Sequence, residues 1–211
     1  VNDTDILKLN SKELVQFRQN NMSMVFQKFA LFPHKTVLQN VGYGLAIQKI
    51  SEKEWSKKAK KWISRVGLDG YENYYPGQLS GGMQQRVGLA RALATDAEIL
   101  LMDEAFSALD PLIRSEMQNI LLDLQNELHK TIIFITHDLD EALKIGDRIA
   151  ILRDGSMVQD SDPQEIIMKP ADDYVSDFIK DINRARVIQA KSIMTPTKSK
   201  SAGPVVKENM V

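Results

Sequence analysis

Residues 79–110, LSGGMQQRVGLARALATDAEILLMDEAFSALD, contain the strongest structural pattern in this sequence. Its first part is a short polar, glycine-rich turn that leads into small and apolar residues at helical spacing. Its second part, Ile99–Met102, is a continuous apolar run that ends in two acids, Asp103 and Glu104. Such a run is typical of a strand buried on both faces of a parallel sheet. Acids at the carboxyl end of that strand lie where open α/β sheets bind their ligands.

The composition is that of an ordinary globular protein. The 211 residues suit one large domain or one domain with a tail, and a hydrophobic content of 43% is enough for a core. The chain has 27 basic and 28 acidic residues, so its balanced charge gives no reason to expect nucleic acid or an anionic membrane as a partner. Cysteine is absent, which excludes disulfides and thiol chemistry. No apolar run reaches the roughly 18 residues that span a bilayer, so membrane association is expected to come through a partner.

Upstream of the central stretch, two short elements are predicted. Residues 11–20 form a helix with Ser11 as its N-cap. Residues 22–26 form a short apolar strand that ends before Gln27. In the segment that follows, His34 is expected to be a loop residue rather than a ligand.

An amphipathic helix is predicted for residues 51–66 from apolar residues at helical spacing. Ser51 and Glu54 predict a capping box at its start, and Gly67 predicts its end. A solvated face is expected for the lysines between the apolar positions rather than a nucleic-acid patch, because Glu52 and Glu54 dilute their charge. These lysines are Lys57, Lys58, Lys60 and Lys61.

Downstream, Asp110 and Pro111 predict the start of a long helix, with the aspartate as cap and the proline in the first turn. Residues 131–136 predict another buried strand, which leads to His137. Asp138 and Glu141 resemble a second capping box. A short helix, a β-hairpin and two more short helices are then expected at residues 139–145, 148–158, 163–168 and 172–179.

Taken together, these motifs resemble those of the ATP-binding cassette (ABC) ATPases. Residues 79–86 are similar to the signature motif, residues 99–104 to the Walker B strand and residues 107–110 to the D-loop. Gln27 and His137, each after a strand, are similar to the Q-loop glutamine and the H-loop histidine. The resemblance implies an α/β fold, a P-loop NTPase of the ABC type with an inserted helical subdomain.

The resemblance also implies a domain organisation. The ABC domain covers residues 1–183, with the helical subdomain at about residues 28–79. No G-x-x-x-x-G-K-[ST] Walker A motif occurs in the sequence, so an N-terminally truncated cassette that is inactive by itself is expected. Residues 184–211 are expected to be a linker or the start of a C-terminal CBS-like region, since Ile-Met-Thr-Pro at 193–196 resembles the opening of such a domain; a disordered tail is the alternative.

Phosphoryl transfer requires charge neutralisation and a positioned water, and the resemblance assigns these tasks to residues at the strand ends. Glu104 would be the general base, with Gln27 and His137 as further catalytic residues. Asp103 and Gln27 would hold Mg²⁺, a cation that prefers oxygen ligands. Two adjacent carboxylates without a cation would repel each other, which favours the functional reading of Asp103 and Glu104 over a structural one.

ATP held by a second copy of the chain would be contacted by the glycine-rich turn. A helix N-terminus favours phosphate, and glycine lets the backbone come close. For one of the residues assigned to this contact, Asp110, helix capping alone is an equally good explanation. Arg86, just beyond the turn, could form a surface or an intersubunit salt bridge. The residues assigned to ATP are Ser80, Gly81, Gly82, Gln84 and Asp110.

Within the class, residues 24–41, 80–94, 99–114 and 136–155 resemble the ATPase subunit of glycine betaine/proline (quaternary amine) importers. This implies an ATPase that powers osmolyte uptake with ATP and Mg²⁺ and works as a homodimer. Its partners would be a membrane permease and a periplasmic or extracellular substrate-binding protein, at the cytoplasmic face of the plasma membrane; nucleic acid is not an expected partner. Alternatives are an importer ATPase for another small solute, a soluble non-transport ABC ATPase, and an inactive regulatory or assembly protein.

Overall fold

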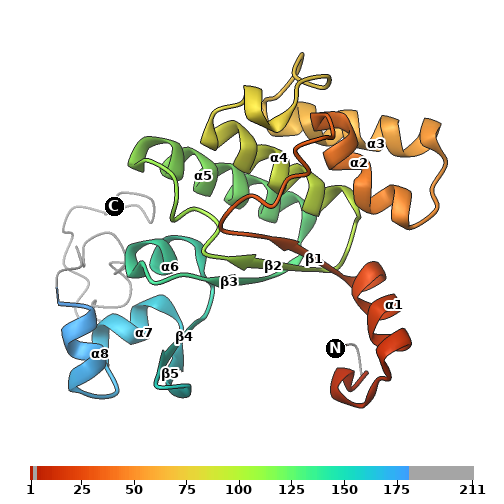
Figure 1. The fold of residues 1–211 in the computed structure, drawn as a ribbon. Coiled ribbons are helices and arrows are strands. Elements are labelled where there is room, and N and C mark those ends of the chain that lie inside the picture. The colour runs from red at the N-terminus through yellow and green to blue at the C-terminus, as the bar shows by residue number, and fades with distance from the viewer. Residues whose placement is uncertain (2–3, 181–211) are drawn as a thin grey trace, which may run out of the picture. The chain divides into compact units, whose positions relative to one another are not determined.

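The computed structural model describes residues 1 and 4–180 (Figure 1). The chain divides into two compact units, residues 1–137 and residues 138–211. The linker or CBS-like region predicted at 184–211 lies outside the described residues.

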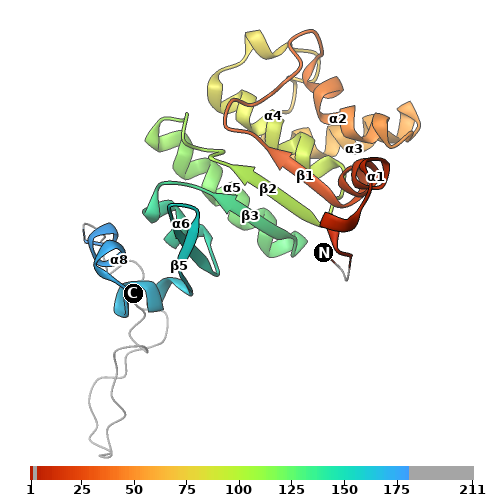
Figure 2. The same ribbon diagram turned by 60° about the horizontal axis from the view of Figure 1, so that its bottom comes forward.

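A three-stranded parallel sheet forms the centre of the first unit, in the order β1-β2-β3. The strands are Met22–Val25 (β1), Ile99–Asp103 (β2) and Thr131–Ile135 (β3). They lie side by side in Figure 2 and agree with the predicted strands to within one residue. Because they are parallel, their carboxyl ends lie at the same edge of the sheet.

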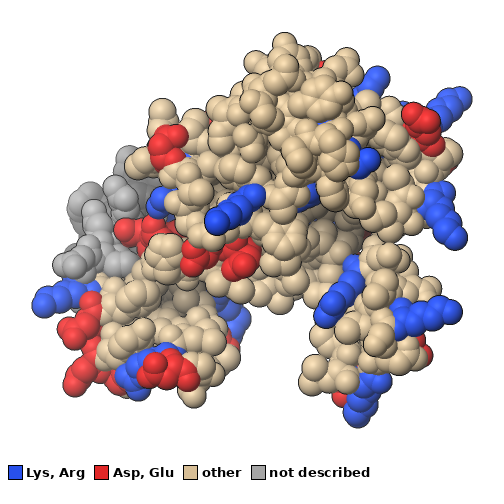
Figure 3. Space-filling model, in the orientation of Figure 1, with Lys and Arg blue, Asp and Glu red and all other residues tan. Residues whose placement is uncertain are grey.

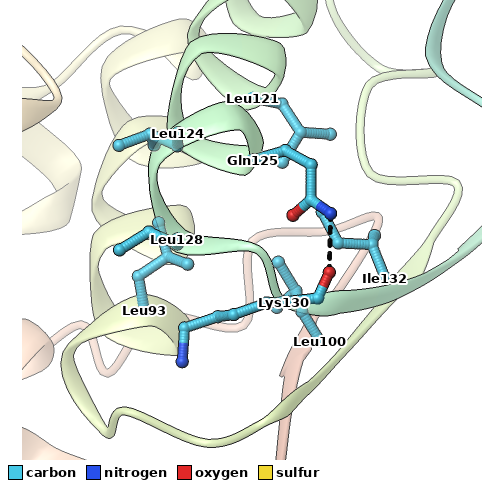
Figure 4. Close-up of a pocket in the computed structure, with 8 residues that line it drawn as sticks. All are labelled: Leu93, Leu100, Leu121, Leu124, Gln125, Leu128, Lys130 and Ile132. Carbon is cyan, nitrogen blue, oxygen red and sulfur yellow. Dashed lines mark hydrogen bonds between the residues drawn. The ribbon is translucent and has the colours of Figure 1, made fainter.

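One face of this sheet is covered by α4 (Gly81–Ala94) and α5 (Pro111–Leu128). Figure 4 shows leucines of both helices around Leu100 of β2 and Ile132 of β3, with a void of only about 10 Å³ between them. Gln125 closes one side by donating a hydrogen bond to the Lys130 carbonyl at 2.7 Å. Each fully buried leucine contributes roughly 1.5–3 kcal/mol, so this layer holds α4 and α5 in place relative to the strands.

The opposite face of the sheet is more exposed than expected for strands that are buried on both faces. Ile133 and Ile135 of β3 are 52% and 57% exposed. β3 lies at the edge of the sheet, and the helices that cover Leu100 and Ile132 lie on the other face. The prediction of a fully buried strand is therefore wrong for β3 in the described structure.

A group of three packed helices precedes β2: α2 (Val37–Ile47), α3 (Glu52–Arg65) and α4. The structure confirms the helix start near Ser51 but not its capping box, because Ser51 Oγ donates to the Glu54 carboxylate instead of accepting a backbone N–H. Gly67 ends α3 with a φ of +70°. The boundaries proposed for the helical subdomain stay a prediction.

The predicted solvated face of α3 is confirmed, since all four of its lysines are exposed. On the face of the molecule that Figure 3 shows, basic side chains are scattered among uncharged ones and form no continuous surface.

Helix α1 (Ser11–Asn21) leads directly into β1. Its N-cap is Asn10 rather than the predicted Ser11. The Asn10 side chain accepts hydrogen bonds from the N–H groups of Lys12 and Glu13, and the Glu13 carboxylate accepts one from the Asn10 N–H. A full capping box therefore forms one residue earlier. Two 3₁₀ turns, at Ile6–Lys8 and Pro76–Gln78, complete this unit.

The second unit contains the predicted helix, hairpin and two short helices. Asp154 and Gly155 at the hairpin turn both have positive φ, 51° and 77°, as a two-residue type I′ turn requires. Asp138, Asp162 and Asp172 cap the three helices. The elements are α6 (Leu139–Ile145), β4 (Ile149–Arg153), β5 (Ser156–Ser161), α7 (Pro163–Met168) and α8 (Asp173–Phe178).

Candidate functional site

Polar residues follow all three strands of the central sheet at one edge. Gln27 comes two residues after β1, Glu104 directly after β2 and His137 two residues after β3. The Glu104 side chain lies between the other two. Its Oε2 accepts a hydrogen bond from Gln27 Nε2 at 2.9 Å, and its Oε1 lies 3.2 Å from His137 Nδ1. The structure thus brings together the three residues predicted to be catalytic.

The backbone of Glu104 is in the left-handed region, with a φ of 43°. This conformation is uncommon for a residue with a side chain and costs of order 1–3 kcal/mol. It persists because the Glu104 N–H donates to the Ile135 carbonyl at 2.9 Å, which extends the β2–β3 ladder by one residue. The carboxylate is therefore held by its backbone as well as by its two side-chain partners.

Ser107 is a member of this cluster that the sequence reasoning did not assign. Its Oγ donates to the Glu104 carbonyl at 2.9 Å and accepts a hydrogen bond from Gln27 Nε2 at 3.2 Å. It thereby fixes both the turn after β2 and the amide of Gln27. Its position three residues after Glu104, where a side chain can reach back to a turn carbonyl, is the signal that could have found it.

Asp103 is the last residue of β2 and is half-buried. Gln27 uses Nε2 for Glu104 and Ser107, which leaves its amide oxygen as the atom that could bind a cation. Among residues 1 and 4–180, no group of three or more His, Cys, Asp or Glu side chains could hold a metal ion. Mg²⁺ is commonly bound by one or two carboxylates with substrate phosphates and water, and Asp103 presents one carboxylate at this edge of the sheet.

A second group of predicted residues surrounds the starts of α4 and α5. Ser80 caps α4, and its Oγ accepts a hydrogen bond from the Met83 N–H at 3.3 Å. Gly81 and Gly82 form the first turn, where backbone N–H groups have no partner within the helix. A Cβ on Gly82 would lie 2.7 Å from Ile113 Cγ2. The close packing of α4 on α5 is therefore one physical reason for glycine at this position.

Gln84, Asp110 and Arg86 have local partners in this second group. Gln84 Nε2 donates to the Leu79 carbonyl, and the Asp110 carboxylate caps α5 by accepting the Ile113 N–H at 3.2 Å. These bonds stay within the helix starts, so this group is assembled separately from Glu104. Arg86 forms an ion pair with Glu116 at 2.6 Å and donates to the Val66 carbonyl, so its salt bridge is within the chain.

The family model of the ABC transporter matches residues 1–107. These residues contain the carboxyl ends of β1 and β2 and the whole glycine-rich turn. This chain belongs to the ABC transporter family. The α/β cassette predicted from the motifs is thereby confirmed.

Relatives of this ABC chain share most of its length. The glycine betaine/carnitine transport ATP-binding protein GbuA of Listeria monocytogenes is 59% identical over 190 residues, which are 90% of this chain and 48% of that protein. The glycine betaine/proline betaine transport system ATP-binding protein ProV of Escherichia coli is 51% identical over 197 residues, 93% of this chain and 49% of that protein. The ABC chain spans about half the length of these curated relatives.

Among solved structures, the ABC chain is similar to a dimeric ATP-binding cassette in a post-hydrolysis state bound to ADP and Pi. That likeness has a TM-score of 0.69 with 34% identity and covers 77% of this chain and 72% of the other. Within residues 1 and 4–180, no helix combines the length and the apolar character needed to cross a bilayer.

Proposed function

We propose that this chain forms the hydrolytic part of an ABC importer ATPase that powers uptake of glycine betaine, proline or a related quaternary amine. One observation carries the proposal: Glu104 is held between Gln27 and His137 at the ends of three neighbouring parallel strands. A carboxylate with a fixed position and fixed neighbours is what a general base for water requires. The reaction is ATP + H₂O to ADP and phosphate.

In this mechanism, Glu104 accepts a proton from the attacking water as the water oxygen bonds to the γ-phosphorus. The bond from that phosphorus to the β-phosphate oxygen breaks, and ADP leaves with the electron pair. Each carboxylate oxygen has a second lone pair, so Glu104 can accept the water proton while it keeps its contacts with Gln27 and His137. Those contacts restrict the carboxylate to one orientation, which lowers the cost of aligning the water.

His137 and Asp103 are assigned to the negative charge of the phosphates, His137 by direct contact and Asp103 through Mg²⁺. With Nδ1 directed at Glu104, the other ring nitrogen of His137 remains available, and the side chain is 72% exposed. We assign this nitrogen to a γ-phosphate oxygen. Asp103 and the amide oxygen of Gln27 would hold Mg²⁺, which neutralises developing negative charge on the phosphates.

The second group, at the start of α4, is proposed to act across a head-to-tail homodimer. The N–H groups of Gly81 and Gly82 suit a phosphate, and Ser80 and Gln84 are placed beside them. The hydrogen bonds of this group are separate from those of Glu104, so one copy would supply the base and the other this turn. Asp110 would lie at the seam as well as capping α5.

The partners and location are proposed from the same relatives. GbuA and ProV are transport ATP-binding proteins for glycine betaine with carnitine or proline betaine. By analogy, this chain would work with a membrane permease and an extracellular or periplasmic binding protein, at the cytoplasmic face of the plasma membrane.

ATP turnover by the full-length protein in complex with its permease tests the site. His137→Ala removes the contact with Glu104 and the ring nitrogen assigned to phosphate, so turnover is expected to fall by roughly 10²-fold or more. His129→Asn is the matched control, because His129 caps the C-terminus of α5 at a φ of 49° and asparagine tolerates that conformation. Equal turnover by the His137→Ala and wild-type complexes would overturn the assignment.

A further inference from the structure

The segment after Gln27 has an unusual backbone. Phe29 and Ala30 are consecutive residues with positive φ, 56° and 47°. Each costs of order 1–3 kcal/mol when it is not glycine, so neighbouring structure must hold them. The structure shows what holds them: one face of helix α4.

Arg91 of α4 contacts this pair, and two glycines of the same helix lie beside it. Arg91 donates from Nη1 to the Ala30 carbonyl at 2.7 Å and from Nη2 to the Phe29 carbonyl at 3.1 Å. The Phe29 ring lies 3.7 Å from where a Cβ on Gly81 would be, and the Phe29 carbonyl oxygen lies 3.6 Å from the corresponding point on Gly88. Positions 81, 88 and 91 lie on one face of an α-helix. The two strained residues therefore pack against this face of α4.

The other end of the segment is fixed as well. Asn40 of α2 is fully buried; its side chain accepts the Phe32 N–H at 2.8 Å and donates to the Phe32 carbonyl at 3.1 Å. Arg91 uses both terminal nitrogens for carbonyl groups, and burial lowers the pKa of its guanidinium. Arg91 is half-buried, so its charge loses part of its hydration and needs hydrogen bonds in compensation. Here the compensating bonds are those to the strained pair.

We propose that Arg91 is a positioning residue that holds Gln27 in place through the carbonyl groups of Phe29 and Ala30. Gln27 precedes Phe29 by two residues, so relaxation of the left-handed pair moves the amide away from Glu104 and Ser107. The inference rests on the proposed function, because Gln27 affects turnover only if it belongs to an ATPase site. Arg91 lies 64 positions away from Gln27 in the sequence, and its described hydrogen bonds do not include one to Glu104.

A double-mutant cycle tests this link by ATP turnover of the full-length protein with its permease. Arg91→Met is expected to lower kcat roughly 10-fold or more with little change in KM, since small misplacements of catalytic groups cost up to ~10²-fold. In a Gln27→Ala background, the same substitution is expected to change kcat less than about two-fold, because its effect passes through Gln27. Full additivity of the two substitutions would overturn the proposal.

Arg86→Met is the matched control on the same helix. Arg86 also donates to a backbone carbonyl, that of Val66, and pairs with Glu116, but it does not contact the strained segment. Its effects are expected to add to those of Gln27→Ala. If Arg86→Met and Arg91→Met both lost their effect in the Gln27→Ala background, the specific role of Arg91 would be refuted.

Hydrogen exchange separates this inference from the proposed function, because it requires no turnover. In Arg91→Met, the backbone amides of residues 28–31 are expected to exchange at least about 10-fold faster, as the held conformation opens locally. Arg91→Lys keeps one donor nitrogen in place of two and is expected to restore part of the protection. The variants are expected to fold, since Ala30 is exposed and Phe29 is half-buried, so water can hydrate the freed carbonyl groups. Unchanged exchange in Arg91→Met would overturn the proposal even if the ATPase assignment stands.

Discussion

Glu104→Gln is the substitution that separates hydrolysis from structure in this site. Glutamine has nearly the same shape as glutamate, so its oxygen can keep accepting the hydrogen bond from Gln27 Nε2, and the Gln27 amide oxygen keeps its orientation. The new amide N–H then faces His137 Nδ1, which accepts a hydrogen bond when the ring proton is on the other nitrogen. Exchanging charge-assisted for neutral hydrogen bonds costs roughly 1 kcal/mol, and the Glu104 side chain is 32% exposed, which reduces that cost. Folding and ATP binding are expected to persist.

Hydrolysis is expected to respond differently. The variant lacks the carboxylate to which we assign the water proton, and loss of a positioned general base lowers the rate roughly 10²- to 10⁴-fold. This corresponds to about 3 to 5 kcal/mol of activation free energy. The predicted penalty on the reaction is thus several times larger than the predicted penalty on stability.

The assay is phosphate release by the full-length protein in complex with its permease, with ATP affinity and the lifetime of the ATP-bound dimer measured on the same samples. Glu52→Gln is the control, since Glu52 is an exposed acid in the first turn of α3 and makes the same change of charge. If Glu104→Gln kept most of the wild-type turnover, Glu104 would not be the base and the reasoning about this site would be wrong.

Three other variants probe the remaining groups. Asp103→Asn is expected to raise the Mg²⁺ concentration needed for half-maximal ATP binding at least about 10-fold, which a magnesium titration would show; an unchanged requirement would remove Asp103 from the metal site. Ser80→Arg is expected to abolish ATP-driven dimerisation while the monomer stays folded, and light scattering that still shows dimers would count against the proposed seam. Gly82→Ala is expected to lower the free energy of unfolding by roughly 1–3 kcal/mol through overpacking; urea denaturation should show the loss disappear in an Ile113→Ala background, and a persistent loss would refute the packing explanation.

The features that the sequence predicted well are local or carried by strong patterns. The apolar run at Ile99–Met102 identified β2 because few other elements tolerate such a run beside two acids. Asp110 followed by Pro111 predicted the start of α5, since the two residues suit the cap and the first turn by their chemistry alone. The grouping of Gln27, Glu104 and His137 was implied by the resemblance to ABC ATPases, and the structure places all three after strands that share one edge of a parallel sheet.

Other features depended on choices that the sequence leaves open. Asn10 and Ser11 are neighbouring cap formers, and only the reciprocal bond from the Asn10 N–H to Glu13 decides between them. Ser51 has the right spacing for a capping box, but its hydroxyl has a charged acceptor within reach in Glu54. Helix α2 was not assigned from its sequence, although Thr36 and Gln39 form a capping box at its start.

Tertiary contacts were beyond the reach of pattern reasoning. Arg91 contacts carbonyl groups that lie 61 and 62 residues away in the sequence. The residue types of Phe29 and Ala30 do not predict a left-handed backbone. From the sequence, Gly82 was expected to let the backbone come close to a phosphate. The structure adds a second reason for glycine there, because Ile113 packs closely against this position. A backbone carbonyl as a partner leaves no signature in a sequence, because every residue has one.

ATP-driven uptake of glycine betaine is the measurement that decides whether this chain powers quaternary amine import. The full-length protein and its permease would be placed in lipid vesicles, with MgATP on the side of the ATPase and the binding protein and labelled glycine betaine on the other. We expect uptake that requires ATP and that falls to background with Glu104→Gln, while the Glu52→Gln complex transports normally. Uptake of glycine betaine that proceeds equally with the Glu104→Gln complex, or ATP turnover by a wild-type complex that transports no quaternary amine, would contradict this expectation.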